Sequence, residues 1–113
     1  MRDVAVIGVG MTHFGKFLDI PLKELGRMAT WDSLKDAGMS PRDIQIAYIG
    51  NACASILTGR TMVLGQIILE EVGIRRIPIT NIENACASGS SAFREAWMSV
   101  ASGLYDVPLA VGA

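Results

Sequence analysis

The sequence predicts an α/β fold with a mainly parallel sheet, in the element order β-α-β-α-β-α-β. Short β-branched apolar runs alternate along the chain with longer segments whose apolar residues recur at helical spacing. Glycine or proline stands at several of the boundaries between these two kinds of segment. Strands that alternate with helices in this way pair in parallel through right-handed crossovers, so the sheet is expected to be mainly parallel.

The first half of the chain contains two expected strands and one expected helix. Residues 4–9 are a short β-branched run closed by glycine, a pattern typical of a strand buried on both faces. A helix is expected to begin at Pro21, which suits a first helical position, and to end before Gly38. Residues 40–43 have the pattern of a cap and a single turn, and residues 44–50 follow as the second strand.

The second half of the chain repeats this alternation. Thr61 is placed to cap a second helix that Gly73 closes, and residues 78–82 are expected to form the third strand. A third helix is expected over residues 88–103, and residues 107–111 form the fourth strand. The apolar face expected for the third helix consists of Phe93, Ala96, Trp97, Val100, Ala101 and Leu104.

The third helix has little of the charged face that a surface helix normally shows. Between residues 84 and 104 the only charged residues are Arg94 and Glu95. We therefore expect this helix to be covered on two sides. Because the chain also stops directly after a strand, without a polar tail, residues 1–113 are expected to be an incomplete piece of a larger subunit.

Length and charge exclude several classes of function. A chain of 113 residues, half of them apolar, is long enough for one ordinary domain. Its net charge of -1 comes from balanced acids and bases without a long run of either sign, so neither nucleic acid nor an acidic membrane surface is an expected partner. No signal-peptide pattern is present, and the longest uncharged stretch, residues 44–59, is shorter than the roughly 20 residues of a spanning helix.

The cysteine content indicates a reducing compartment. Two cysteines are too few for a disulfide framework, and neither lies at metal-ligand spacing from the single histidine, His13. We therefore predict a cytoplasmic protein without a metal site. Gly8 and Gly10 suggest a dinucleotide fingerprint, but His13 stands where the third glycine is required, so no bound cofactor is expected.

Both cysteines lie in copies of one pentapeptide, N-A-C-A-S, at residues 51–55 and 84–88. Cys53 is expected to lie in a loop between the second strand and the second helix, away from a helix dipole. Cys86 follows a strand and directly precedes the small residues that open the third helix, so it is expected at a strand-turn-helix elbow. The flanking sequence thus separates two sites that share the same five residues.

The elbow around Cys86 has two interpretations. A helix start carries free backbone N–H groups and partial positive charge, which favour a thiolate and can also donate to the oxyanion formed when a thioester is attacked. Small residues after Cys86 would let a substrate carbonyl approach the backbone. The alternative is that Cys86 is a small buried residue without chemistry, as cysteines among Ala, Ser and Gly often are.

Three segments resemble the N-terminal domain of the thiolase family. Residues 81–93, N-I-E-N-A-C-A-S-G-S-S-A-F, closely resemble the acylation site of thiolases. Residues 4–16, V-A-V-I-G-V-G-M-T-H-F-G-K, are similar to the start of the branch that includes sterol-carrier-protein thiolases and archaeal acetyl-CoA acetyltransferases. Residues 105–112, Y-D-V-P-L-A-V-G, resemble the fourth strand of the same domain, so the resemblance covers the whole chain.

The resemblance implies a thiolase-like fold and one catalytic residue in this chain. Cys86 matches the cysteine that accepts an acyl group from acyl-CoA as a thioester, and its backbone N–H would form half of an oxyanion hole. The activating histidine, a second cysteine and much of the coenzyme A site belong to the C-terminal domain of the family, which is absent here together with the loop domain. Coenzyme A thioesters are thus the expected substrates, and this chain alone is expected to be inactive.

The resemblance also implies partners. Thiolases dimerise through the third strand, so a homodimer is expected to form through residues 79–85. Some relatives work in a complex with 3-hydroxy-3-methylglutaryl-CoA synthase and a zinc-binding OB-fold protein, which makes such a complex possible here. Cys53 would line the site at most, and His13 is expected to be a surface or packing residue.

Two alternatives to a thiolase are left open by the sequence. A 3-oxoacyl synthase or a 3-hydroxy-3-methylglutaryl-CoA synthase shares the fold and the cysteine elbow, although an acidic residue often stands there in place of Asn84. The other alternative is a non-catalytic homologue that binds acyl groups or lipids. A histidine motif of the type G-H-P and a later C-x-G motif would identify a thiolase.

Overall fold

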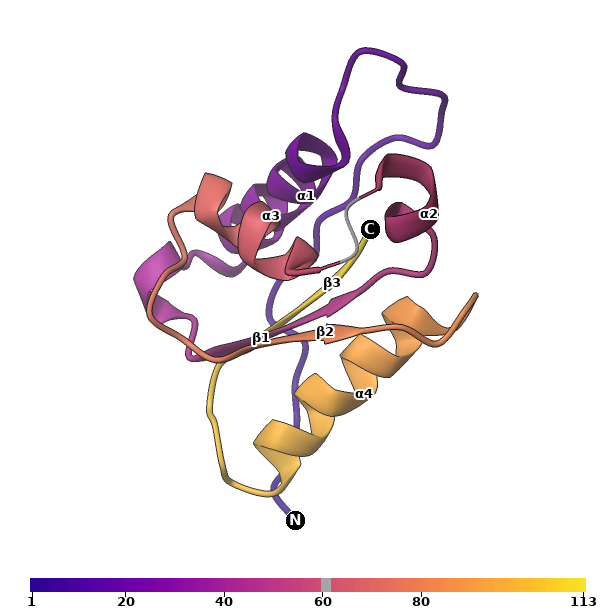
Figure 1. The fold of residues 1–113 in the computed structure, drawn as a ribbon. Helices are drawn as coiled ribbons and strands as arrows, with labels where there is room; N and C mark the ends of the chain where they lie inside the picture. The colour runs from indigo at the N-terminus through magenta and orange to yellow at the C-terminus, as the bar shows by residue number, and fades with distance from the viewer. Residues whose placement is uncertain (60–61) are drawn as a thin grey trace.

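The computed structural model describes residues 1–59 and 62–113, and its elements alternate between helix and strand along most of the chain (Figure 1). The helices are α1 (Leu22–Ala37), α2 (Ala54–Thr58), α3 (Leu64–Val72) and α4 (Ser88–Ala101), with a single 3-10 turn at Pro41–Asp43. The strands are β1 (Ile46–Gly50), β2 (Ile79–Ile82) and β3 (Pro108–Gly112). The predicted cap at Thr61 lies outside the described residues.

The three strands form one parallel sheet with helices on both faces. The strand order is β2-β1-β3, and both pairings of β1 are parallel, as predicted. Helices α1 and α3 lie side by side over one face, and α4 crosses the other face against β1 and β3 (Figure 1). The carboxyl ends of all three strands therefore meet at one edge of the sheet, where the β2–α4 connection also lies.

The central strand β1 supplies side chains to both cores. All five of its residues are buried, which agrees with the β-branched, apolar composition of residues 46–50. Ala47 and Ile49 join the larger core with Ile68 and Leu69 of α3. Ile46 and Tyr48 point to the opposite face and pack against Ala92 and Ala96 of α4. The alternation of side chains along one strand thus connects the two helical layers.

Helix ends agree with the sequence prediction where glycine closes the helix. Gly38 follows α1 with φ of 66° and Gly73 follows α3 with φ of 86°, both in the left-handed region. The backbone N–H of each glycine donates back to the last turn of its helix. Glycine is favoured at these two positions because other residues adopt this conformation only at a cost.

The predicted first strand, residues 4–9, is wrong: this segment forms no strand, and Val6, Ile7 and Val9 are each more than half exposed. A strand needs a hydrogen-bonded neighbour, and residues 4–9 pair with neither of the two edge strands of the sheet, β2 and β3. Gly8 instead packs so closely on α1 that a Cβ there would lie 2.6 Å from Ala37 Cβ. An apolar groove separates the segment from β3 and α4.

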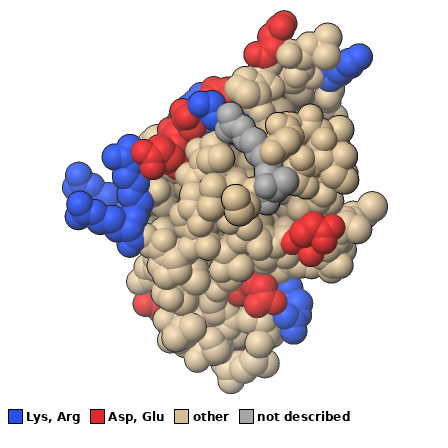
Figure 2. Space-filling view, viewed as in Figure 1, with Lys and Arg blue, Asp and Glu red and all other residues tan. Residues whose placement is uncertain are grey.

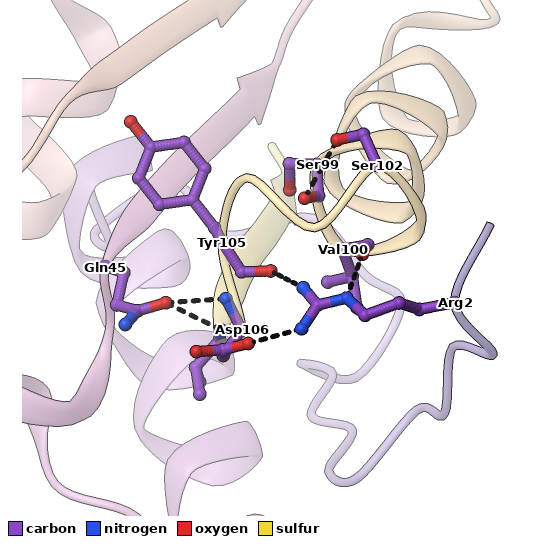
Figure 3. A network of polar contacts seen from close by, with 8 residues as sticks. Arg2, Gln45, Ser99, Val100, Ser102, Tyr105 and Asp106 are labelled. Atoms are coloured by element: carbon purple, nitrogen blue, oxygen red, sulfur yellow. Dashed lines mark hydrogen bonds and ion pairs between the residues drawn. The ribbon is translucent and has the colours of Figure 1, made fainter.

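Arg2 attaches the N-terminal segment to the end of α4 (Figure 3). Its guanidinium donates to the backbone oxygens of Val100 and Tyr105 at 2.9 and 2.8 Å and to Asp106 Oδ1 at 2.7 Å. Its backbone N–H donates to the carbonyl of Ala101. These contacts join residues about a hundred positions apart in the sequence. They hold the start of the N-terminal segment against the rest of the chain, although the segment pairs with no strand.

The apolar face predicted for the third helix is only partly correct. Ala96 and Ala101 are buried, but Phe93, Trp97 and Leu104 are exposed by 54%, 38% and 71%. The residues that face the sheet are small, because α4 lies close over β1 and β3; they are Ser88, Ala92, Ala96 and Ser99. The large apolar side chains of α4 are therefore exposed to solvent among the described residues. That this helix is covered on a second side stays a prediction.

Charged side chains are sparse and mixed on the face shown in Figure 2. Lysines and arginines lie mostly near aspartates and glutamates at the margins, and uncharged atoms cover most of the centre (Figure 2). Glu70 and Glu71 are exposed and pair with Arg75 and Lys23, respectively. The structure thus agrees with the balanced charge of the sequence.

Candidate active site

Cys86 lies on the connection between β2 and α4, two residues before the helix begins, and its side chain is exposed. The predicted strand-turn-helix geometry is therefore confirmed. No side chain caps the start of α4, where Ala87 occupies the N-cap position. The N–H of Ser88, the first residue of the helix, donates to Ala85 O in the preceding turn. The N–H groups that follow in a first helical turn have no partner within the helix, so this end of α4 presents donors and partial positive charge beside the thiol.

The backbone of the elbow turns sharply at Ala85. This residue has φ of 46°, in the left-handed region that residues with a side chain seldom adopt. Several hydrogen bonds close the turn around it: Ala87 N–H donates to Asn84 O at 2.9 Å, and Ser88 N–H donates to Ala85 O at 3.2 Å. Asn84 Nδ2 also donates to the Ser91 hydroxyl at 3.0 Å. The turn carries Cys86 on a constrained backbone.

Two glycines at strand ends let the elbow rest directly on the sheet. A Cβ at Gly50, the last residue of β1, would lie 2.5 Å from the Ser88 carbonyl carbon and 2.8 Å from Gly89 N. Gly112, the last residue of β3, lies opposite Gly89, and a Cβ there would be 3.6 Å from Gly89 Cα. Glycine at Gly50 therefore allows the first turn of α4 to approach the sheet, which places Cys86 at the carboxyl edge of the strands.

The first copy of the pentapeptide folds differently from the second. The prediction that Cys53 lies in a loop away from a helix dipole is wrong, because Cys53 is the N-cap of the five-residue helix α2. Asn51 causes this turn: its Oδ1 accepts a hydrogen bond from Ala54 N–H at 2.7 Å. In the second copy the corresponding side chain, Asn84, bonds to Ser91 of α4 instead. Both thiols are free and exposed.

The side chain of His13 is exposed. Among the described residues it has no hydrogen-bond or ion-pair partner. It lies in the segment between residues 10 and 21, which contains no helix or strand. The structure thus places the only histidine of the chain on the surface, as predicted for a packing or surface residue.

A pocket of about 310 Å³ opens at the carboxyl ends of β1 and β2, between α2 and the start of α3. Its polar lining residues are Asn51, Ser55, Asn81 and Glu83. Asn81 is held in place, since its Oδ1 accepts from Gly65 N–H at 2.6 Å and its Nδ2 donates to Gln66 Oε1 at 2.8 Å. Sequence reasoning missed this pocket, because its residues come from separate elements.

The burial of Ser88 is a second feature that sequence reasoning missed. Its side chain is 4% exposed although Cys86, Ala87, Gly89 and Ser90 around it are exposed. The available signal was a hydroxyl residue among the small residues that open a helix, a pattern that by itself indicates only a helix start.

The described residues contain no group of three His, Cys, Asp or Glu side chains that could hold a metal ion. Among the same residues, no helix has both the length and the apolar character needed to cross a membrane.

Comparison with known proteins gives one family over nearly the whole chain. The family model described as thiolase, N-terminal domain, matches residues 4–113. The acetyl-CoA acetyltransferase of Methanothermobacter thermautotrophicus is 38% identical over 112 residues, covering 99% of this chain and 29% of the relative. That of Methanocaldococcus jannaschii is 41% identical over 112 residues, covering 99% and 28%. The chain therefore spans less than a third of the length of these curated relatives.

A solved structure supports the fold. The crystal structure of 3-oxoacyl-[acyl-carrier-protein] synthase III from Aquifex aeolicus superposes with a TM-score of 0.63 at 15% identity, covering 75% of this chain and 27% of that one. At this identity the likeness concerns the arrangement of helices and strands alone.

Proposed function

Since the chain belongs to the thiolase family as its N-terminal domain, we propose that it supplies the acyl-accepting cysteine, Cys86, of an acetyl-CoA acyltransferase. The observation that carries this proposal is the exposed Cys86 thiol beside the uncapped start of α4. The substrates are acyl-CoA and acetyl-CoA, as the names of the relatives indicate for those proteins.

The proposed reaction has two half-reactions through a thioester. In the first, a base takes the proton of the Cys86 thiol, and the thiolate attacks the carbonyl carbon of acyl-CoA. The bond from that carbon to the sulfur of coenzyme A breaks, and the protonated base returns the proton to coenzyme A as it leaves. In the second, a base removes a proton from the methyl group of acetyl-CoA, and the resulting carbanion attacks the acyl carbon. A carbon–carbon bond forms, the bond to Cys86 Sγ breaks, and the thiolate is regenerated.

The elbow supports the first half-reaction in two ways. Backbone N–H groups at the start of α4 would donate to the oxyanion of the tetrahedral intermediate, where the macrodipole also stabilises negative charge. The residues that follow Cys86 are small, namely Ala87, Ser88 and Gly89, so no large side chain blocks the approach of a thioester carbonyl to these N–H groups.

The remaining catalytic groups are proposed to lie outside this chain. The family resemblance assigns the activating histidine and the second cysteine to a C-terminal domain, whereas the only histidine here, His13, is exposed and unbonded. We therefore expect the purified 113-residue chain to show no coenzyme A-dependent cleavage of acetoacetyl-CoA. Measurable cleavage by this chain would refute that assignment.

The homodimer, the larger complex and the cytoplasmic location extend the same proposal. Strand β2 is an edge of the sheet and leaves Thr80 and Asn81 exposed, so residues 79–85 are available for pairing with a second copy.

The complex with 3-hydroxy-3-methylglutaryl-CoA synthase and an OB-fold protein rests on the family resemblance. A reducing cytoplasm agrees with two exposed cysteines that are free.

Alkylation of the two cysteines tests the proposed nucleophile. With limiting iodoacetamide near neutral pH, we expect Cys86 to be labelled faster than Cys53, because the thiolate is the reactive form and the start of a longer helix favours it. Peptide mass spectrometry gives the two rates in the same sample. Cys86→Ser and Cys53→Ser are the matched controls, and labelling of Cys53 at an equal or higher rate would contradict the proposal.

A further inference from the structure

The Ser88 hydroxyl connects the two backbone groups on either side of the turn at Ala85. Its oxygen accepts a hydrogen bond from Asn84 N–H at 2.8 Å, and its proton is donated to Ala85 O at 2.7 Å. Ser88 is 4% exposed, whereas Asn84 and Ala85 are exposed, so the two bonds are part-buried with the hydroxyl on their shielded side. The Ser88 side chain thus bonds both to the N–H of Asn84, which precedes Ala85, and to the carbonyl oxygen of Ala85 itself.

This bridge stabilises an otherwise unfavourable conformation. Ala85 has φ of 46°, and a residue with a side chain persists in that region only when its surroundings over-determine it. The Asn84 N–H and Ala85 C=O can both reach the Ser88 hydroxyl because the chain reverses between them. If Ala85 returned to a negative φ, the direction of the next residue, Cys86, would change.

The bridge differs from the ordinary serine bond found within helices. Ser99, on the same helix, is 5% exposed and donates to Ala96 O at 2.8 Å, three residues earlier. Ser88 makes the same backward bond to Ala85 but also accepts the Asn84 N–H from outside the helix. Ser99 therefore matches Ser88 in burial, in its helix and in the bond to the carbonyl three residues earlier. It lacks the hydrogen bond that Ser88 accepts from the elbow.

We propose that Ser88 is a positioning residue for Cys86: its buried hydroxyl holds Ala85 in the left-handed conformation that aims the thiol at the start of α4. This inference rests on the proposed function, in which Cys86 is the nucleophile. Ser88 acts through the backbone, and its hydroxyl has no contact with the reacting atoms. The close packing of Gly50 on the Ser88 carbonyl fixes the other side of the same residue against the sheet.

The test compares Ser88→Ala with Ser99→Ala in the full chain. The measured quantity is the ratio of the iodoacetamide labelling rates of Cys86 and Cys53 in one sample, with folding checked by circular dichroism. We expect Ser88→Ala to lower the ratio about tenfold, the order set by the cost of holding a left-handed residue. Ser99→Ala is expected to leave the ratio unchanged. A general loss of structure would also bring the two rates together, so the lowered ratio supports the proposal only where the circular dichroism spectrum of Ser88→Ala matches that of the unmodified chain.

A spectroscopic measurement accompanies the rates. The three-bond HN–Hα coupling of Ala85 reports its φ, and we expect Ser88→Ala to change it whereas Ser99→Ala leaves it at the value of the unmodified chain. In the unmodified chain, hydrogen exchange of the Asn84 amide is expected to be slow although Asn84 is exposed, because the amide donates to a buried hydroxyl. This last measurement applies even if Ser88→Ala does not fold.

The outcomes separate this inference from the proposed function. If Cys86 is no faster than Cys53 in the unmodified chain, the proposed nucleophile fails and the role of Ser88 fails with it. If Cys86 is faster but Ser88→Ala leaves the rate ratio and the Ala85 coupling unchanged, only the role of Ser88 is overturned. Unprotected exchange of the Asn84 amide in the unmodified chain would also overturn it.

Discussion

Gly50 and Ser88 meet backbone to backbone: a Cβ on Gly50 would lie 2.5 Å from the carbonyl carbon of Ser88. This contact joins the end of β1 to the first turn of α4, two residues after Cys86. The distance between the sheet and the elbow is therefore determined by the absence of a side chain at residue 50. The same contact makes the site sensitive to substitutions in the sheet.

Gly50→Ala is expected to lower the free energy of unfolding by about 1–3 kcal/mol, the usual cost of overpacking. The atoms opposite the new methyl group are backbone atoms of Ser88 and Gly89, which cannot move as a flexible side chain does. Urea denaturation followed by circular dichroism measures the change. Gly112→Ala is the matched control at the end of β3, because its methyl group would meet only Gly89 Cα at 3.6 Å. Equal losses of unfolding free energy in both variants would contradict the close contact of Gly50 with the backbone of Ser88.

Leu69→Ala is expected to destabilise the chain by about 2–5 kcal/mol, as large-to-small substitutions in a core do. Leu69 is 0% exposed and belongs to the larger core with Ile49 and Leu34. Leu18, which is 80% exposed, supplies a control with the same substitution, and its loss should stay within about 0.5 kcal/mol. Thermal unfolding of both variants gives the comparison, and a small effect at Leu69 would show that this core is not as packed as described.

Arg2→Ala is expected to cost more stability than Asp106→Asn, although both remove the ion pair between them. Asp106 is 69% exposed, and exposed pairs contribute about 0–1 kcal/mol. Arg2 also donates to the carbonyls of Val100 and Tyr105, and Asp106→Asn leaves those two bonds intact. Urea denaturation in low and high salt measures both costs. Equal costs that vanish together in high salt would assign the whole effect to the ion pair.

The Glu24–Arg27 pair predicts a small dependence of stability on pH. The Arg27 side chain hydrogen-bonded to Glu24 holds the pKa of that carboxyl below its ordinary value of 4.5. Because the pKa is lower in the folded state, the pair contributes fully above pH 4.5, and its contribution is lost as the pH falls through the lowered value. Glu24→Gln should lose less stability than the unmodified chain over that interval. Parallel pH curves from denaturant melts would exclude a contribution from this carboxyl.

Most secondary structure could be predicted because it follows local patterns. Helices α1 and α3 end at the glycines that predicted their ends, and the three strands lie within two residues of the expected ranges. The resemblance of the chain to the thiolase family is confirmed by the match over residues 4–113. The elbow could be predicted as well, because a strand, a cysteine and a run of small residues follow one another directly in the sequence.

Local pattern could not predict features that depend on a distant partner. Residues 4–9 have the composition of a strand, but they pair with neither free edge of the sheet, and Gly8 packs on α1 instead. The two copies of N-A-C-A-S illustrate the same limit. Asn51 accepts a hydrogen bond from the Ala54 N–H beside Cys53, whereas Asn84 bonds to the longer helix after Cys86, so identical residues adopt different structures.

The periodicity of apolar residues and the small residues after Cys86 were sufficient to identify α1, α3, α4, the three strands and the candidate nucleophile, because these features depend on neighbours in the chain. Helix α2 was expected to be a loop. The strand order, the burial of Ser88 and the seating of the elbow on Gly50 depended on contacts between segments far apart in sequence. Such contacts form only when the whole chain is packed, and they hold the backbone that carries Cys86 against the sheet.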